Sequence, residues 1–312
     1  MFATVASTVC LAHGARAEPT ELGPPTPPGG GTEAAPAPAP APYTASYGLR
    51  APAAATYVRA ETAYGLNAGA SSTVVQYLSA SYAPVDRLSI YARTGWVDYL
   101  PDKGPSGTAV TNVVLGAQWA DKLSPELRWA ATLGTGLPVG QGGGDTPDPG
   151  AAAAIAAGNL ARSRLDGSTM FSPNDIAPFA GGDLAWVSGG FTLQAEVTLF
   201  ELLRVRGSQV DPDSAKTSLD LGLHAGYFIV PELSVSLELR DQSFLSAPAA
   251  VDAGKISRSW VTAGGGVRAH FNLGEHVWLR PGLAYVQPLN DPSPTISASN
   301  FHIFQLDLPL SF

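Results

Sequence analysis

Alternation of apolar and polar residues over many short stretches is the feature that most constrains how this chain folds. In residues 219–227, leucine, alanine and tyrosine occupy the odd positions, while aspartate, glycine and histidine occupy the even ones. Residues 233–240 repeat the pattern, with leucine and valine alternating with serine, glutamate and arginine. A period of two is typical of a β-strand with one apolar and one polar face. Such stretches predict twelve strands, at residues 54–66, 73–83, 87–98, 110–120, 126–138, 176–187, 190–204, 216–230, 233–243, 257–271, 276–287 and 299–312.

The connections between these strands alternate in length. Short ones are expected at residues 84–86, 121–125, 188–189, 230–232 and 272–275, and the intervening ones are longer, at 97–109, 139–175, 205–215, 245–256 and 288–298. Only the first connection of the second kind, near 67–72, is short. Short turns at one end and long loops at the other are typical of barrels that cross a bacterial outer membrane. The predicted fold is therefore all-β, a transmembrane antiparallel up-and-down barrel of about twelve strands.

Aromatic residues on the apolar faces of the predicted strands gather near the two ends of the strands. A soluble β-sandwich has no physical reason for such sorting, whereas aromatic rings in membrane proteins gather at the two lipid–water interfaces. We therefore expect outer-membrane lipid to surround the barrel. The ends beside the short turns carry Tyr82, Trp119, Trp129, Trp186, Phe191, Tyr227, Phe271 and Phe312, and the opposite ends carry Tyr64, Trp96, Tyr285 and Phe304.

The last predicted strand ends in a regular apolar pattern. Its alternate positions are Phe304, Leu306, Leu308, Leu310 and the terminal Phe312. This pattern resembles the C-terminal signature of Gram-negative outer-membrane β-barrel proteins, and the resemblance covers the architecture of residues 43–312. It implies a bacterial outer-membrane location and recognition by the barrel-assembly machinery through the exposed edge strand and its terminal aromatic residue. It names no substrate.

The N-terminal part of the chain is unlike the rest. Residues 1–17 have the apolar run and the small-x-small pattern of an export signal, although no basic residue precedes the run, so either the signal is atypical or the true start lies upstream. Residues 18–43 form a Pro/Ala/Gly-rich tract, interpreted as a disordered periplasmic linker or a tail that binds a periplasmic partner. Residues 44–312 are assigned to the barrel. The one cysteine, Cys10, lies in the expected signal.

Charged residues on the polar faces are expected to point into the lumen. An unpaired charge in a narrow protein-lined space is costly, so the six cations and six acids should pair with one another. Strand registers estimated from the short turns place His224 opposite Glu238, Asp307 near Arg59, and Arg268 opposite Arg280. The last pair is either neutralised by a carboxylate such as Glu238 or Asp307, or attracts anions in a pore. The predicted lumen lining is Arg59, Glu61, Arg93, Arg128, Asp183, Glu196, Asp220, His224, Glu238, Arg240, Arg268, Arg280 and Asp307.

The longest connection contains a predicted short helix. Asp148 followed by Pro149 has the form of an N-cap and a first helical residue, and residues 150–160 are rich in alanine. The segment either folds into the lumen and constricts it or covers the mouth of the barrel. We expect partial constriction.

The function predicted from these features is a narrow porin-like channel for passive diffusion of small polar solutes. The alternative is a closed structural barrel that anchors a periplasmic tail or displays surface loops, and a lipid-acting enzyme is a distant third. A formal net charge of −8 without a basic patch argues against nucleic acid as a partner. No pattern for catalysis, a cofactor or a metal stands out, so we expect no enzyme activity and no cofactor.

Overall fold

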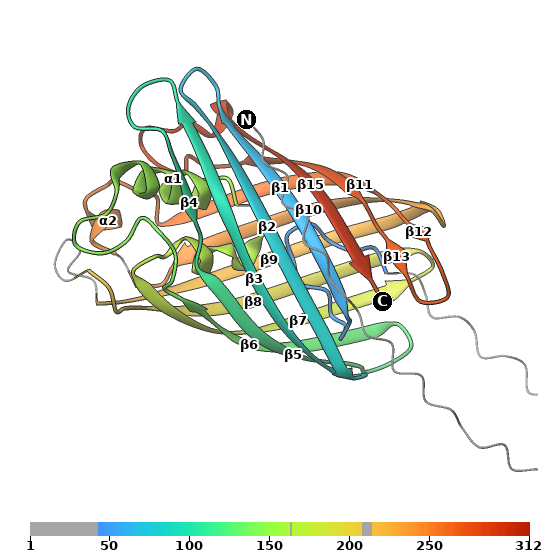
Figure 1. Ribbon diagram of the computed structural model, residues 1–312. Coiled ribbons are helices and arrows are strands. Elements are labelled where there is room, and N and C mark those ends of the chain that lie inside the picture. The colour runs from blue at the N-terminus through green and yellow to red at the C-terminus, as the bar shows by residue number, and fades with distance from the viewer. Residues whose placement is uncertain (1–42, 163, 208–213, 247) are drawn as a thin grey trace, which may run out of the picture. The chain divides into compact units, whose positions relative to one another are not determined.

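Strand segments from the whole described chain form one antiparallel sheet that closes on itself, because β1 pairs with β15 as well as with β2 (Figure 1). The structure is a computed structural model that describes residues 43–162, 164–207, 214–246 and 248–312. The expected export signal and all of the Pro/Ala/Gly-rich tract except Tyr43 lie outside these residues. The strands are β1 Tyr57–Asn67, β2 Ser71–Val85, β3 Leu88–Pro101, β4 Gly107–Val110, β5 Val113–Lys122, β6 Leu127–Leu137, β7 Asp175–Ser188, β8 Phe191–Arg204, β9 Ala215–Val230, β10 Leu233–Phe244, β11 Ser259–Ala269, β12 Phe271–Asn272, β13 Trp278–Leu279, β14 Gly282–Pro288 and β15 Phe301–Ser311.

These segments make a closed barrel of twelve strands, which confirms the predicted fold. Three strands are interrupted: β4 continues into β5, β11 into β12, and β13 into β14. Pro281 explains the last break, because proline has no backbone N–H for the sheet. One expected loop was wrong in extent: residues 97–109 were assigned to a loop, but β3 continues to Pro101 and pairs with β4.

The expected helix in the long connection is present as α1, Pro149–Leu160. The Asp148 side chain accepts a hydrogen bond of 2.8 Å from the backbone N–H of Ala151, and Pro149 stands in the first turn. A 3-10 helix, η1 at Leu165–Phe171, follows it. The short helix α2, Ala249–Asp252, and the 3-10 turn η2, Ala298–Asn300, were not predicted. No helix in the described ranges is both long and apolar enough to span a membrane.

The outer face of the barrel is apolar. Leu133, Leu237 and Leu283 are each more than half exposed, as suits side chains that face lipid. Of the twelve aromatic residues expected on this face, eleven are exposed, and Trp129 is half-buried. We call the end with the short connections at 86–87, 123–126, 189–190, 231–232 and 273–277 the turn end, and the opposite end the loop end.

The loop-end half of the lumen holds an apolar core. Helix α1, η1 and the described residues between them, together called the loop insert, pack against the inner faces of the strands. Ala154, Ile155, Met170 and Phe171 of the insert are buried in one cluster with Val75, Val97, Val114, Phe301 and Ile303 of the wall. Asn112, in the break between β4 and β5, fixes the insert: its side-chain amide donates to the Thr169 and Ser172 carbonyls at 3.1 and 2.7 Å. The expected constriction by the 139–175 segment therefore lies inside the barrel.

Candidate functional site: the occupied lumen

The turn-end half of the lumen contains residues 43–56, the segment that leads into β1. We call this segment the N-terminal insert (Figure 1). Residues 46–50 are buried, and the segment contacts strands that lie far away in sequence. Tyr43 donates its hydroxyl to Gln194 at 2.7 Å, and the Thr44 backbone N–H bonds to the Thr192 hydroxyl at 3.0 Å. The sequence assigned residues 44–56 to the barrel domain, with the first strand expected from residue 54, and the structure places this segment within the lumen.

Glu238 holds the middle of the N-terminal insert. Its carboxylate accepts the backbone N–H groups of Tyr47 and Gly48 at 2.5 and 3.0 Å. On its other side it pairs with Arg240 and lies 3.5 Å from His224, its expected cross-strand partner. Hydrogen bonds to an ionised acceptor are among the strong ones, so Glu238 is a main anchor of the insert.

Arg50 of the N-terminal insert supplies a cation that the wall lacks. Its guanidinium lies 2.9 Å from Glu196 and 3.6 Å from Asp183, and its backbone N–H donates to Glu196 at 2.6 Å. Asp183 and Glu196 are opposite each other in the sheet, where two like charges are unfavourable. The insert therefore neutralises a pair of carboxylates on β7 and β8.

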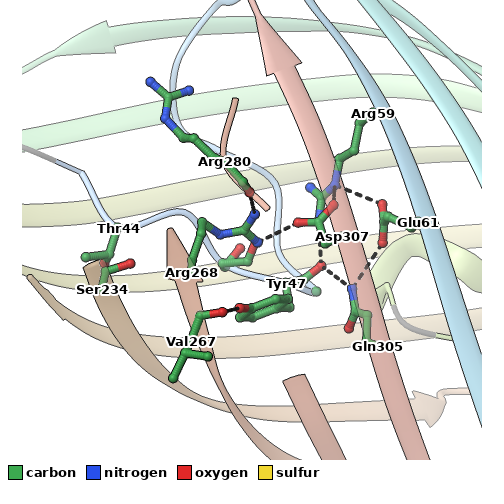
Figure 2. Close-up of polar contacts among 12 residues, drawn as sticks. Thr44, Tyr47, Arg59, Glu61, Ser234, Val267, Arg268, Arg280, Gln305 and Asp307 are labelled. Atoms are coloured by element: carbon green, nitrogen blue, oxygen red, sulfur yellow. Dashed lines mark hydrogen bonds and ion pairs between the residues drawn. The ribbon is translucent and has the colours of Figure 1, made fainter. Parts of the chain in front are cut away.

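A cluster around Asp307 ties the insert to β1, β11 and β15 (Figure 2). Asp307 accepts from Arg59 at 2.6 Å and from Arg268 at 2.5 Å, so the expected Arg59–Asp307 contact is present. Arg268 also lies over the Tyr47 ring, 4.5 Å from its centroid. Burial raises the pKa of the Tyr47 phenol to about 12, so it remains a donor to the Val267 carbonyl at neutral pH.

The expected pairing of Arg268 with Arg280 was wrong. Arg268 is opposite Gly282, and its guanidinium donates to the backbone carbonyl of Arg280 at 2.7 Å. The turn between β12 and β13 spans 273–277 and is centred one residue later than the estimate assumed, which shifts the pairing by two residues. The register is the same on both sides of Pro281. The carboxylate that neutralises Arg268 is Asp307, one of the two expected candidates.

The two inserts meet near the middle of the lumen. The backbone N–H of Leu165 donates to the Gly48 carbonyl at 3.0 Å, and Arg164 reaches the Leu49 carbonyl at 3.4 Å. Gly222 on β9 makes room for both, because a Cβ there would lie 2.9 Å from side-chain carbons of Leu49 and Leu165. Together the inserts occupy the lumen from both ends.

The inserts also change the charge balance expected for the lumen. The wall alone has the six arginines and six acids that the alternation predicts, but the inserts add Arg50, Arg162 and Arg164, all buried. Burial lowers the pKa of Arg162 to about 10, which leaves it charged at neutral pH beside Asp220. Among the charges predicted for the lumen and the described charges that the inserts add, cations thus exceed acids by three, and the expected balance of six to six is corrected. Asp175, a further acid on an inner face, pairs with Lys216 at 3.3 Å.

The structure places the predicted lining residues on the inner side of the barrel. Ten of them are buried: Glu61, Arg93, Asp183, Glu196, Asp220, His224, Glu238, Arg240, Arg268 and Asp307. Arg59, Arg128 and Arg280 are partly exposed toward the turn end. Their role as the lining of a conducting pore stays a prediction.

A cavity of about 430 Å³ opens at the turn end, between the wall and the N-terminal insert. Asp307 is the one acidic residue in its described lining, which also includes His276, Trp278 and the terminal Phe312. Seven arginines line it: Arg50, Arg59, Arg93, Arg128, Arg164, Arg268 and Arg280.

Among the side chains that the structure describes, the polar groups of the lumen do not assemble a recognisable reaction centre. Nδ1 of His224 lies 3.5 Å from Glu238, but Nε2 lies 3.1 Å from the Thr44 carbonyl, so the ring does not face a serine nucleophile. In the described ranges no group of three or more His, Cys, Asp or Glu side chains is arranged to hold a metal ion.

Sequence reasoning missed the N-terminal insert. One signal for it exists: after the Pro/Ala/Gly-rich tract, residues 43–50 read Tyr-Thr-Ala-Ser-Tyr-Gly-Leu-Arg, which combines two aromatic rings and a cation without strand alternation. Such a composition is unusual for a solvated linker. It suits a segment that contacts a polar interior.

Comparisons with solved structures agree with this architecture. The NanC porin covers 82% of this chain and 98% of its own, with a TM-score of 0.50 and 8% sequence identity. The fold is that of an outer-membrane β-barrel. The KdgM porin (81% and 99% covered, TM-score 0.43, 8% identity) and the β domain of the Bordetella autotransporter BrkA (83% and 98%, TM-score 0.44, 13% identity) also match. No protein-family model and no curated protein sequence matches the chain.

Proposed function

We propose that this protein is a porin-like channel for small polar solutes, closed in this conformation by its two inserts. The observation that carries the proposal is that the closure comes from segments outside the wall. The wall presents small residues where the N-terminal insert packs: a Cβ at Gly226 would lie 2.0 Å from the Thr44 hydroxyl, and one at Gly266 would lie 2.6 Å from the Tyr47 ring. Removal of the inserts would leave a passage through a barrel of intermediate width, polar in its turn-end half and more apolar in its loop-end half.

The order of opening follows from the contacts between the inserts. The N-terminal insert continues into the wall through β1, and it supports Arg164 and Leu165 of the loop insert. Its withdrawal would uncover the tip of the loop insert, which would move next. The channel therefore has a two-part gate.

The second candidate is a closed structural barrel, and the apolar core of the loop insert favours it. A cluster in which Val97, Ala154 and Met170 are fully buried is costly to open. In a closed barrel the N-terminal insert would serve as an anchor for the tract that precedes it. The two candidates differ in whether loosening both inserts produces a current.

Planar-bilayer recordings of the refolded full chain test the proposal. Glu238→Gln loosens the N-terminal insert and Phe171→Ala the loop insert; we expect rare openings in the wild type, more in each variant, and frequent discrete steps when the two are combined. Each protein is first shown to be folded by its heat-modifiable mobility. Glu126→Gln, an exposed carboxylate at the turn end, is the matched control and should behave as the wild type. Silence of the folded double variant would reject the channel in favour of the closed barrel.

The orientation and assembly of the protein belong to the same proposal. The turn end would face the periplasm of a Gram-negative bacterium and the long loops the exterior, after export directed by residues 1–17. The barrel-assembly machinery would recognise β15, whose Phe304, Leu306, Leu308 and Phe312 are exposed on the outer face. Residues 18–42 would lie in the periplasm, as a linker or as the binding site for a periplasmic partner, whereas Tyr43, expected in the same tract, belongs to the N-terminal insert.

A further inference from the structure

The cavity at the turn end gathers cations from parts of the chain that are remote in sequence. Arg59 comes from β1, Arg93 from β3 and Arg128 from β6, whereas Arg268 comes from β11 and Arg280 lies between β13 and β14. The N-terminal insert adds Arg50 and the loop insert adds Arg164. Only the closed barrel with both inserts in place brings these seven guanidinium groups to one space.

The described lining of this cavity is mostly positive. Seven guanidinium groups and one carboxylate, that of Asp307, line it. Within this lining, ion-pair distances to carboxylates on the wall are found for Arg50, Arg59, Arg164 and Arg268. Arg162 and Arg240, which lie beside Asp220 and Glu238, do not line the cavity. Positive charge is therefore concentrated on the described lining.

Arg280 shows how a lining arginine is presented. Its guanidinium donates to the Ser311 hydroxyl at 2.8 Å and lies 5.2 Å from the centroid of the Trp278 ring. In Figure 2 it points away from Arg268 and Asp307. A hydroxyl and an aromatic face hold the group in position without neutralising its charge, so it can still attract an anion.

We propose that this cavity is a binding site for a small organic anion that carries carboxylate or phosphate groups and enters from the turn end. Guanidinium groups bind the oxygens of either group in pairs, which makes arginine suited to both. A volume of about 430 Å³ lies in the range of small-molecule pockets and holds a ligand of several such groups. An anion there would lie against the guanidinium groups of the lining.

The proposed site would define the class of solute for the channel proposed above, but it is tested by ligand binding and not by conductance. Binding without conductance would support the site in a closed barrel, and conductance without binding would reject the site and leave the channel standing. The two proposals therefore fail separately.

Calorimetric titration of the refolded full chain tests the site with three probes: citrate for carboxylates, inorganic phosphate for phosphates, and glucose as a neutral solute. We expect saturable binding of citrate or phosphate and none of glucose, and the stronger of the two anions assigns the chemical group. Arg280→Gln and Arg128→Gln should each weaken the binding about tenfold or more, because each removes charge-assisted hydrogen bonds.

The matched control is Arg87→Gln, which removes the same charge at the same end. Arg87 is exposed outside the cavity, in an ion pair of 3.1 Å with Asp121. This variant should bind the anion as the wild type does. Absence of saturable binding by both anions, or equal weakening in Arg87→Gln and Arg280→Gln, would overturn the proposal, because the second result would mean that net charge alone attracts the anion.

Discussion

The two inserts occupy one lumen but are held there by different forces. The loop insert is joined to the wall at both ends, through β6 and β7, and buries an apolar core in which Ile155, Met170 and Phe171 pack against valines of the wall. The N-terminal insert is held mainly by polar contacts, chiefly those of Glu238 and Arg50, and continues into the wall through β1. The burial of apolar surface makes the loop insert part of the folded core, whereas the N-terminal insert is removable without opening that core.

This difference between the inserts predicts that removing a buried side chain from the loop insert destabilises the whole barrel. Phe171 is buried, and its ring meets Tyr77 edge to face at a centroid distance of 6.3 Å. Phe171→Ala should lower the free energy of unfolding by about 3–5 kcal/mol, the usual cost of removing a buried phenylalanine ring. The measurement is urea unfolding in detergent, followed by heat-modifiable mobility. Phe271→Ala, which removes an exposed ring from the outer face, is the control; an equal loss in both variants would mean that the loop insert is not part of the core.

The second prediction compares the two inserts directly by thiol labelling. In a chain with Cys10→Ser, Ser46→Cys reports on the N-terminal insert and Thr169→Cys on the loop insert, both at buried positions. We expect a water-soluble maleimide to label position 46 faster than position 169. Adding Glu238→Gln should accelerate labelling at 46 by about 10- to 100-fold, since it weakens hydrogen bonds to a charged acceptor, and leave 169 nearly unchanged. Equal rates at the two positions would remove the distinction drawn between the inserts.

The sequence predicted the wall and the helix because local patterns determine them. Alternation with period two placed the strands, and Asp148 with Pro149 placed the start of α1, whose capping bond is made within its own first turn. The contacts of His224 with Glu238 and of Arg59 with Asp307 also followed, because uninterrupted strands carry their register from one pair to the next.

The features that the sequence did not predict depend mainly on contacts between residues that are distant in the chain. Nothing local in residues 43–56 specifies a position in the lumen; Tyr47 is fixed by Glu238, 191 residues away. The register at Arg268 failed for another reason: the turn at 273–277 is centred one residue later than the estimate assumed. The cation excess escaped as well, because it arises only when both inserts are counted with the wall.

A third prediction uses the space that the wall leaves for the N-terminal insert. A Cβ at Gly226 would lie 2.0 Å from the Thr44 hydroxyl, so Gly226→Ala must displace the insert. Overpacking of this kind costs about 1–3 kcal/mol, and we expect the cost to appear as faster labelling at position 46 without loss of barrel stability. Gly182→Ala is the matched control, because the nearest atom to a Cβ there is 3.7 Å away. A fall in barrel stability in Gly226→Ala would show that the insert and the wall unfold together.

The smallest expected effect concerns the phenol of Tyr47. Tyr47→Phe removes its hydrogen bond to the Val267 carbonyl and should weaken retention of the N-terminal insert by about 1 kcal/mol. Burial, with Asp307 and Glu238 nearby, raises the pKa of this phenol from 10.0 to about 12, against the opposing effect of Arg268 and Arg59. Because the neutral form is favoured in the folded state, its contribution is complete below pH 10 and is lost as the pH rises toward 12.

Two measurements test the prediction for Tyr47. The difference between the absorbance titrations of the wild type and of Tyr47→Phe should show one phenol that ionises near pH 12. The mobility of a nitroxide attached at Ala45→Cys should rise over the same pH interval when Tyr47 is retained. In Tyr47→Phe the mobility should be higher at neutral pH and should lack this step. A phenol that ionises near pH 10 would mean that Tyr47 is exposed to water, and the N-terminal insert would then not be seated in the lumen at all. The contrast between a polar, removable insert and an apolar, fixed one thus depends on a side chain whose titration can be observed directly.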